Sequence, residues 1–183
     1  MSNYRRALVT GGTFFFTVVT HQRRRLLTDP EARAALRTAI EETRAQHPFH
    51  IDAWVLLPDH LHAIWTLPGG DADYSKRWGL IKAKFTKQVK QKYHDPLRMN
   101  QSKQRKREST LWQRRYWEHQ IRDDADFARH VDYIHYNPVK HGLVKRVCDW
   151  PHSTFHSFVA REVYSPEWGS AVANNVDKNG FGE

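Results

Sequence analysis

The order of the expected strands and helices predicts an α+β fold with a four-stranded antiparallel sheet. Apolar patterning along the 183 residues gives the order strand, helix, strand, strand, helix, strand, helix. The two central strands are separated by only two residues, so they form an antiparallel hairpin. This order is the split βαβ arrangement of ferredoxin-like or RRM-like domains, with helices on one face and a third helix added. We therefore expect one domain over residues 1–168 and a loosely held tail over residues 169–183.

The first strand is expected over residues 13–20, a run of β-branched and aromatic side chains that follows a Gly-Gly turn. Asp29 is a suitable helix N-cap because Pro30 follows it at the first helical position. The helix should continue to about Gln46. Its apolar side chains recur at helical spacing and consist of Ala32, Ala35, Leu36, Ala39 and Ile40.

Two further strands are expected over residues 51–57 and 61–67, with only Pro58-Asp59 between them. A Gly-Gly pair ends the second of these strands. Residues 74–93 then show apolar side chains at intervals of three and four, which predicts a second amphipathic helix. Its outer face is rich in lysine, and its apolar face consists of Trp78, Ile81, Phe85 and Val89.

The chain after the second helix divides into a polar stretch, a strand and a helix. Residues 93–110 are basic and lack periodicity, so they are expected to form a flexible loop. Residues 111–121 are rich in aromatic side chains and predict a fourth strand. Asp123 or Asp124 can cap a third helix, which is expected to end near Asn137 because a proline follows. The pattern of the remaining residues is less regular.

The composition indicates a folded, basic protein that binds a polyanion. Lysine and arginine number 29 against 20 acidic residues, which gives a net charge of +9 and a pI near 9.8. An aromatic content of 13% is too high for a disordered basic tail. No apolar run is long enough to span a membrane and no signal-peptide core opens the sequence, so a cytoplasmic location is expected. The single cysteine, Cys148, excludes an intramolecular disulfide and a CxxC zinc site.

Two histidines, His60 and His62, stand two residues apart on one of the central strands. Alternate strand residues share a face, so both imidazoles project from the same side and can bind one divalent ion. The residues expected to pack on the opposite face are Leu61, Ala63, Trp65 and Leu67. The alternative interpretation is chance, because a chain with 12 histidines readily contains such a pair.

The third helix brings Tyr133 and Asn137 to one face. Residues four apart on a helix point in nearly the same direction, so the Tyr133 hydroxyl and the Asn137 amide can reach one site. His130 falls on the same face and can assist. The stripe expected to face the core is Phe127, Val131 and Ile134. Alternatively, Tyr133 is an amphipathic rim residue and Asn137 only ends the helix. Tyr136 competes with Tyr133 as a nucleophile, but it points about 60° away.

These residues resemble a known family, the single-tyrosine HUH transposases, and specifically the REP-associated tyrosine transposases. The resemblance is carried first by His60-Leu-His62 and by the segment YIHYNPVKHG at residues 133–142. Further matching blocks, in the same order, are YRR at 4–6, GGTFFFT at 11–17, WVLLP at 54–58, WQRRYWEH at 112–119 and DWPHSTF at 149–155. The match extends to about Trp168. Its main departure is the enlarged basic loop at residues 93–110.

The resemblance implies an enzyme that cuts and rejoins single-stranded DNA at REP-type hairpins. It implies that His60, His62 and Asn137 bind Mg²⁺ or Mn²⁺, and that Tyr133 attacks a phosphodiester. The product is a 5′-phosphotyrosine link and a free 3′-OH, so the bond energy is kept for strand transfer. No general base for Tyr133 stands out. The resemblance also implies a bacterial monomer that acts on nucleoid DNA, although related insertion-sequence transposases assemble their sites from two chains.

The resemblance and the charge pattern together indicate which residues bind DNA. The family resemblance implies that the N-terminal arginines and the Gly-Gly-Thr turn read a short sequence at the foot of the hairpin. Basic side chains, expected to flank the metal site, can neutralise phosphates, and aromatic side chains can stack bases unless they belong to the core. The expected DNA-binding residues are Arg5, Arg6, Gly11, Gly12, Thr13, Phe14, Lys82, Lys84, Lys87, Arg114 and Arg115.

Two other functions stay open from the sequence. An RRM-like domain with a basic surface can bind nucleic acid without cutting it. A metal-dependent nuclease would release its product by hydrolysis rather than hold it covalently. The histidine pair together with Tyr133 and Asn137 favours strand transfer, because a module that only binds has no need of all four residues.

Overall fold

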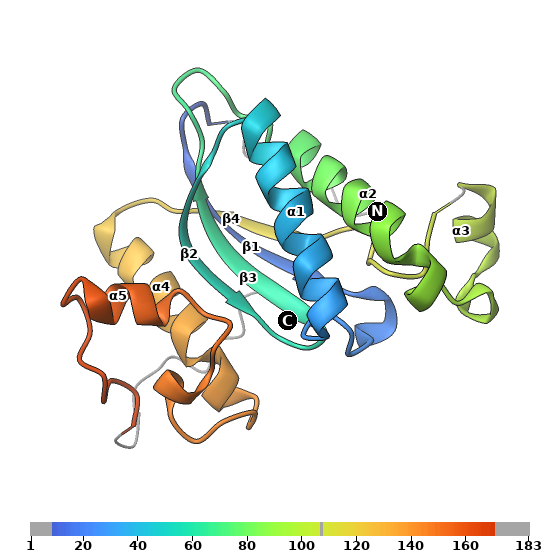
Figure 1. Ribbon diagram of the computed structural model, residues 1–183. Coiled ribbons are helices and arrows are strands. Elements are labelled where there is room, and N and C mark those ends of the chain that lie inside the picture. The colour runs from blue at the N-terminus through green and yellow to red at the C-terminus, as the bar shows by residue number, and fades with distance from the viewer. Residues whose placement is uncertain (1–8, 107, 171–183) are drawn as a thin grey trace.

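The computed structural model describes residues 9–106 and 108–170 and contains a four-stranded antiparallel sheet (Figure 1). The strands are β1 (Thr13–Val19), β2 (His50–Leu56), β3 (His60–Thr66) and β4 (Trp117–Gln120). Their order across the sheet is β2-β3-β1-β4, so β3 and β1 are central. This order confirms the expected α+β, ferredoxin-like fold. Arg5, Arg6 and all but the first two residues of the expected tail lie outside the described residues.

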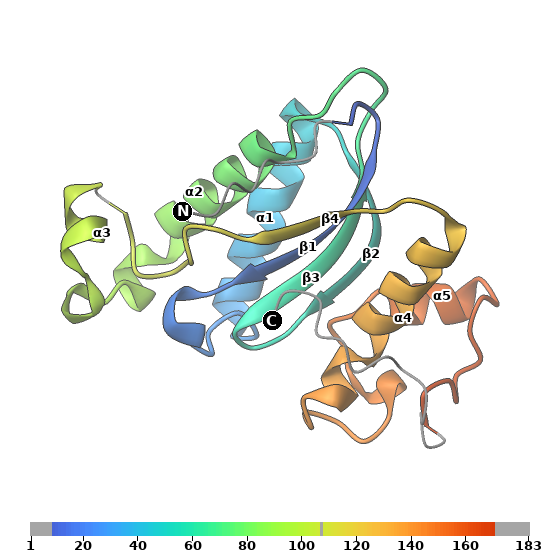
Figure 2. The same cartoon turned by 180° about the vertical axis from the view of Figure 1, so that it is seen from behind.

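Two long helices, α1 (Pro30–Gln46) and α2 (Tyr74–Tyr93), cover one face of the sheet (Figures 1 and 2). Both ranges confirm the sequence prediction, because apolar side chains recur at helical spacing throughout. Beneath them, alternate residues of β3, which include Leu61, Ala63 and Trp65, form the core. The indole of Trp65 stacks on that of Trp78, with ring centroids 4.1 Å apart. One face of β3 is therefore fully used in packing.

The other face of the sheet carries α4 (Asp124–Lys140), with α5 (Phe155–Ala160) beside it (Figure 2). A second apolar cluster joins Phe15 and Ile64 of the central strands to Val131 and Ile134 of α4. The sheet is thus the middle of three layers, and α5 lies where the sequence predicts only irregular structure. Short 3-10 helices occur at η1 (His21–Arg23) and η3 (Val147–Asp149). None of the helices in the described residues has the length and apolar character of a membrane span.

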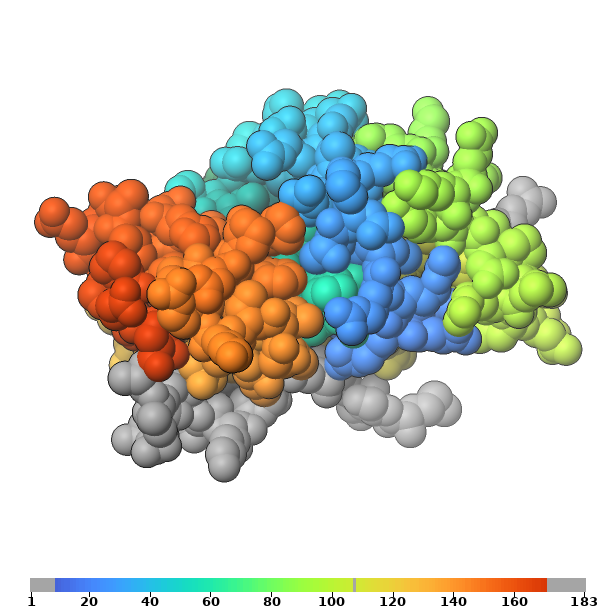
Figure 3. Space-filling model, turned by 60° about the horizontal axis from the view of Figure 1, so that its bottom comes forward, coloured from blue at the N-terminus to red at the C-terminus, as the bar shows by residue number. Residues whose placement is uncertain are grey.

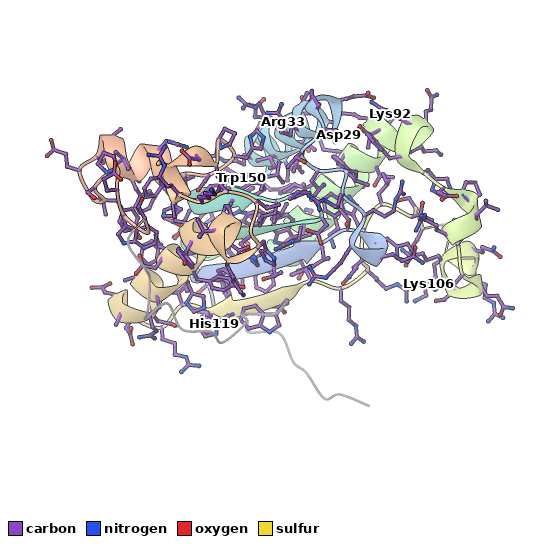
Figure 4. All side chains as sticks on the ribbon, turned by 90° about the horizontal axis from the view of Figure 1, so that it is seen from below. Asp29, Arg33, Lys92, Lys106, His119 and Trp150 are labelled. Atoms are coloured by element: carbon purple, nitrogen blue, oxygen red, sulfur yellow. The ribbon has the colours of Figure 1, made fainter. Side chains whose placement is uncertain are left out.

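The basic stretch between α2 and β4 is more ordered than a flexible loop. Its described residues contain the 3-10 helix η2 (Pro96–Arg98) and α3 (Gln101–Arg105). Lys103 is buried, and its ammonium donates to the carbonyl oxygens of Ser109 and Trp112 at 3.0 and 3.1 Å. Lys106, in contrast, is exposed (labelled in Figure 4). The prediction of a structureless loop is wrong, because composition does not distinguish a buried lysine from the exposed ones around it.

Two element boundaries also differ from the prediction. The fourth strand begins only at Trp117, because residues 113–115 are exposed and Trp112 forms an isolated bridge with Thr20. Helix α4 continues through Pro138 to Lys140 instead of ending at Asn137. Proline is tolerated there because it lies in the last turn, where the His141 N–H still donates to the Asn137 carbonyl at 3.0 Å.

Arg77 and Asp71 form an ion pair near the C-terminal end of β3, the end away from His60, and this pair stabilises the fold. The buried Arg77 guanidinium donates to both carboxylate oxygens of Asp71, at 3.1 and 2.7 Å. These hydrogen bonds hold the pKa of Asp71 below its ordinary value. We expect Asp71→Asn to lower the free energy of unfolding at pH 7 by about 1 to 2 kcal/mol, less than for a fully buried pair because Asp71 is partly exposed.

The pH dependence of this loss follows from the direction of the Asp71 pKa. A lowered folded-state pKa means that the ion pair contributes fully above about pH 4 and is lost as the pH falls through that pKa. Urea titrations of wild type and Asp71→Asn should therefore differ most at pH 7 and converge as the pH falls below 4. Glu41→Gln, an exposed acid on α1, is the control. Equal stability of wild type and Asp71→Asn at pH 7 would contradict the prediction.

Candidate active site

His60 and His62 lie next to each other on β3 and face the layer of α4. Both side chains are buried, and their ring centroids are 4.9 Å apart. This arrangement confirms that the two imidazoles project from one side of the strand, while Leu61 and Ala63 pack on the opposite side. The pair therefore offers two imidazole ligands to one point between the sheet and α4.

Each imidazole is oriented through its Nδ1 atom. Nδ1 of His60 donates to the Asp59 carboxylate at 2.7 Å, and Nδ1 of His62 lies 2.9 Å from the hydroxyl oxygen of Thr17 on β1. Burial raises the pKa of Asp59, but hydrogen bonds from His60 and Arg23 outweigh it, so the pKa lies below its ordinary value and the carboxylate is ionised. With Nδ1 held in this way, Nε2 is the ring atom of each histidine that can bind a cation.

Tyr133 and Asn137 lie one turn apart on α4, over the strands that carry these groups. The Tyr133 ring meets the His62 ring edge-on at a centroid distance of 5.3 Å, and it lies 6.0 Å from the Phe15 ring. Tyr133 and Asn137 are both buried, and the Asn137 amide oxygen is among the buried atoms. Because α4 continues past Asn137, the i+4 geometry holds. The alternative interpretations of a rim tyrosine and a helix-ending asparagine are therefore wrong.

Lys140 provides a cation at the Tyr133 hydroxyl. Its ammonium donates to the Tyr133 oxygen at 3.3 Å and lies 4.8 Å from the ring centroid. Lys140 stands two turns beyond Tyr133, and it reaches the tyrosine because α4 runs through Pro138. An ammonium in this position stabilises a phenolate more than a phenol.

The other rings considered from the sequence lie in different places. Tyr136 packs beside Gly169, where a methyl group on that glycine would lie 3.5 Å from the ring. His135 hydrogen-bonds the Thr154 hydroxyl at 3.0 Å, and burial lowers its pKa to about 3. His141, in contrast, lies beside His60 with ring centroids 5.1 Å apart. The geometry thus favours Tyr133 over Tyr136 and adds His141 to the surroundings of the site.

A second group of possible metal ligands lies on the other side of Phe15. His119 donates from Nε2 to the Asp126 carboxylate at 2.8 Å, and Nδ1 of His130 lies 3.3 Å from the same carboxylate (Figure 4 labels His119). Two imidazoles and a carboxylate are a suitable donor set for a divalent cation. The Phe15 ring, 5.5 Å from His62 and 4.8 Å from His130, lies between the two groups. His130 thus belongs to this second group.

The expected DNA-binding residues do not form one surface. The three lysines of α2 lie in the layer across the sheet from Tyr133, so the expectation that they flank the metal site is wrong. Lys84 pairs with Glu42 at 2.6 Å, whereas Lys82, Lys87 and Arg114 line a cavity of about 480 Å³ between α2 and the basic stretch. Phe14 is fully buried against Tyr74, so a base-stacking role for its ring is wrong.

Several residues of the site were not singled out from the sequence. Lys140 lies within the YIHYNPVKHG block that carries the family resemblance, and Asp59 directly precedes His60, so the position of each is a usable signal. Thr17 is the last residue of the GGTFFFT block, but nothing local in the sequence indicates its role. Its partnership with His62 depends on the register of β1 against β3, in which the two residues are directly opposite.

Comparison with known proteins agrees with this fold. A family model described as "Transposase IS200 like" matches residues 9–137. A REP-associated tyrosine transposase of Escherichia coli (strain K12) is 47% identical over 174 residues, which cover 95% of this chain and 94% of that protein. A protein described in the same terms from Haemophilus influenzae is 46% identical over 92% of this chain and 94% of its own length.

A solved structure is similar over the whole chain. It is a REP-associated tyrosine transposase bound to a REP hairpin, with a TM-score of 0.82 and 46% sequence identity, and the match covers 100% of this chain and 98% of that one. The family model spans β1, the histidine pair and α4 as far as Asn137. The chain therefore belongs to the REP-associated tyrosine transposases, within the IS200-like transposase family, and its enzyme class is that of a transposase.

Proposed function

We propose that this chain is a metal-dependent strand transferase that cuts single-stranded DNA beside a REP-type hairpin through a 5′-phosphotyrosine intermediate. The observation that carries the proposal is the position of Tyr133, which contacts His62 from a helix that also carries the buried Asn137 one turn further on. A relative solved with a REP hairpin supports hairpin DNA as the substrate. The proposed catalytic unit is one domain over residues 1–168, acting as a monomer on nucleoid DNA in the cytoplasm.

His60, His62 and Asn137 are the residues that would hold the cation, Mg²⁺ or Mn²⁺. Their buried Nε2 atoms and amide oxygen form a mixed nitrogen and oxygen donor set, which suits such ions once waters complete the shell. The bound cation would polarise the scissile phosphate and stabilise charge on its non-bridging oxygens. Asp59 and Thr17 fix the imidazole orientations, as outer partners of metal-bound histidines do.

Tyr133 is the proposed nucleophile. Its phenolic oxygen forms a bond to phosphorus while the bond from phosphorus to the 3′ oxygen breaks, so one strand ends in a 3′-OH and the other stays on the enzyme. The phenolic proton passes to water, and the departing 3′ oxygen takes up a proton. A free phenol has a pKa near 10 and is a weak nucleophile at neutral pH. The Lys140 ammonium favours the attacking phenolate by its charge.

We propose that residues near both ends of β1 bind the DNA. Gly11 adopts a φ of +69°, which favours glycine, and its backbone approaches Gly69 closely. The Gly11-Gly-Thr13 turn with Arg5 and Arg6 is proposed to read the foot of the hairpin. Thr13 stands four residues before Thr17, roughly 13 Å along the strand, so the hairpin would lie beside the cleavage site rather than in it. The exposed Arg114 and Arg115 precede β4 and are proposed phosphate contacts.

One experiment separates this proposal from its alternatives. The protein is incubated with Mn²⁺ and a synthetic REP hairpin that carries single-stranded flanks, and the products are resolved in SDS. A strand transferase gives a protein–DNA adduct that resists SDS, a hydrolytic nuclease gives cut DNA without an adduct, and a non-catalytic RRM-like binding module gives neither. We expect the adduct. Cut DNA without an adduct, or uncut DNA, would overturn the proposal.

The contact between Lys140 and Tyr133 gives a prediction on the pH profile. We expect Lys140→Met to slow adduct formation about tenfold at pH 7, because the phenolate loses a neighbouring positive charge, and to shift the pH–rate profile to higher pH. Lys140→Arg should retain most of the activity. Lys145→Met, which removes an exposed lysine after α4, is the control. A uniform loss of rate at every pH would show that Lys140 only supports the structure.

A further inference from the structure

A small cavity opens beside His60. Its volume is about 200 Å³, and its lining residues are Arg23, Arg25, Leu57, Pro58, Asp59, His60, His141 and Leu143. The cavity lies where three parts of the chain meet: the segment after β1, the β2–β3 turn and the end of α4. Figure 3 shows this face, with a teal patch from residues near 60 between the blue segment after β1 and the orange segment that follows α4.

The segment after β1 is held firmly against the β2–β3 turn. The Thr20 hydroxyl donates to the Asp59 carbonyl at 2.8 Å, and the N–H groups of Leu26 and Leu27 both donate to the Pro58 carbonyl, at 2.9 and 2.8 Å. Between these anchors, Gln22 and Arg23 adopt φ angles of 55° and 50°, a left-handed conformation that is costly for residues with side chains. The cavity wall is therefore built from a fixed, strained turn.

The three consecutive arginines of this segment have different surroundings. Arg24 turns away and donates to the Tyr93 carbonyl at 2.6 Å, which ties it to the end of α2. Arg23 donates to the Asp59 carboxylate at 3.3 Å, so it balances the charge that orients His60. Arg25 is exposed and lines the cavity, and within residues 9–106 and 108–170 it makes no hydrogen bond or ion pair.

The charge of the cavity is therefore positive. Arg23 and Arg25 contribute two positive charges, while Asp59 contributes one negative charge that Arg23 and His60 already engage. The His141 imidazole and the apolar Leu57 and Leu143 complete the wall. The Arg25 guanidinium has five N–H donors and lies next to a proposed metal ligand, so it suits an oxygen-rich anion such as phosphate.

We propose that this cavity binds a phosphate of the single strand next to the scissile phosphate, with Arg25 as its main contact and His141 beside it. The inference rests on the proposed function, because His60 is common to the cavity and to the catalytic site. An extended single strand that presents one phosphate to Tyr133 has a neighbouring phosphate available for this cavity. Arg25 would thereby hold the strand in line with the attacking oxygen.

The first test measures the salt dependence of single-strand binding. Fluorescence anisotropy in EDTA follows the binding of an oligothymidylate of about twenty nucleotides to wild type, Arg25→Ala and Arg37→Ala. We expect Arg25→Ala to bind roughly tenfold more weakly and to reduce the slope of log K against log salt by about 0.7, the share of one single-strand phosphate. Arg37→Ala removes an exposed arginine of α1, across the sheet, and should change neither quantity.

The second test locates the phosphate. In a REP hairpin with single-stranded flanks, each flanking phosphate in turn is replaced by a neutral methylphosphonate. Wild type should lose roughly tenfold in affinity at one position, and Arg25→Ala should lose nothing further there. An unchanged salt slope in Arg25→Ala, or the same position-dependent loss in wild type and Arg25→Ala, overturns the cavity proposal even if the adduct forms. Absence of the adduct with a reduced salt slope would instead overturn the proposed function and leave the phosphate site standing.

Discussion

Replacing Tyr133 by phenylalanine is expected to abolish covalent DNA cleavage, with a loss of at least about a thousandfold in rate. The variant removes only the hydroxyl, which carries the atom that bonds to phosphorus in the proposed mechanism. The phenyl ring keeps its contacts with His62 and Phe15, so the fold should be retained. DNA affinity should change by less than about threefold, because phosphate contacts elsewhere supply most of it. Single-turnover assays on a labelled hairpin oligonucleotide measure the rate, and anisotropy measures the affinity.

Tyr136→Phe is the matched control for this prediction. It removes a single hydroxyl from the same helix at a residue that packs beside Gly169 instead of His62. It should therefore cleave at close to the wild-type rate. Adduct formation by Tyr133→Phe at the wild-type rate, or loss of the adduct in Tyr136→Phe, would show that Tyr133 is not the nucleophile.

His60→Ala and His62→Ala are each expected to reduce cleavage by at least about a hundredfold while most of the DNA affinity remains. Either change removes one of two imidazoles that face the same point, so the cation loses a ligand. Binding of Mn²⁺, measured by calorimetry, should weaken in parallel with activity. The proposed phosphate contacts come from lysine and arginine side chains rather than from these histidines, so the affinity for a hairpin oligonucleotide in EDTA should change little.

The control for the histidine variants is His50→Ala. His50 is an exposed histidine on β2 that pairs with Asp52, and its loss should leave both cleavage and Mn²⁺ binding intact. A crystal soaked in Mn²⁺ adds a direct test, because the anomalous peak identifies the ligands. A peak between His60 and His62 agrees with the proposal, whereas a sole peak at His119, Asp126 and His130 would contradict it.

Local sequence patterns predict the elements of the fold that depend on residues close together in the chain. Alternation along β3 placed the two histidines on one face and Leu61 and Ala63 on the other, as the structure confirms. Apolar spacing gave α1 and α2 almost to the residue. Asp29 is the N-cap residue of α1, as predicted, but its carboxylate accepts a hydrogen bond from the Tyr93 hydroxyl instead of capping the helix, because the end of α2 lies against the start of α1.

The remaining features depend on contacts between distant parts of the chain. Thr17 orients His62 only because β1 and β3 pair in one register, and Arg25 reaches the side of His60 only because the segment after β1 is anchored to Pro58. The basic stretch could not be distinguished from a flexible loop, since the partners that bury Lys103 lie several residues away. The extension of α4 through Pro138 contradicted a local rule, and it is this extension that brings Lys140 to Tyr133.

The most direct test of the central claim is to identify the residue that carries the DNA after cleavage. The SDS-resistant adduct formed with Mn²⁺ and a hairpin oligonucleotide is digested with trypsin and nuclease, and the modified peptide is sequenced by mass spectrometry. The proposed mechanism predicts a nucleotide joined through its 5′ phosphate to Tyr133, on the peptide that begins after Arg129. Attachment at Tyr136, attachment through a 3′ phosphate, or cleaved DNA with no modified peptide would contradict it.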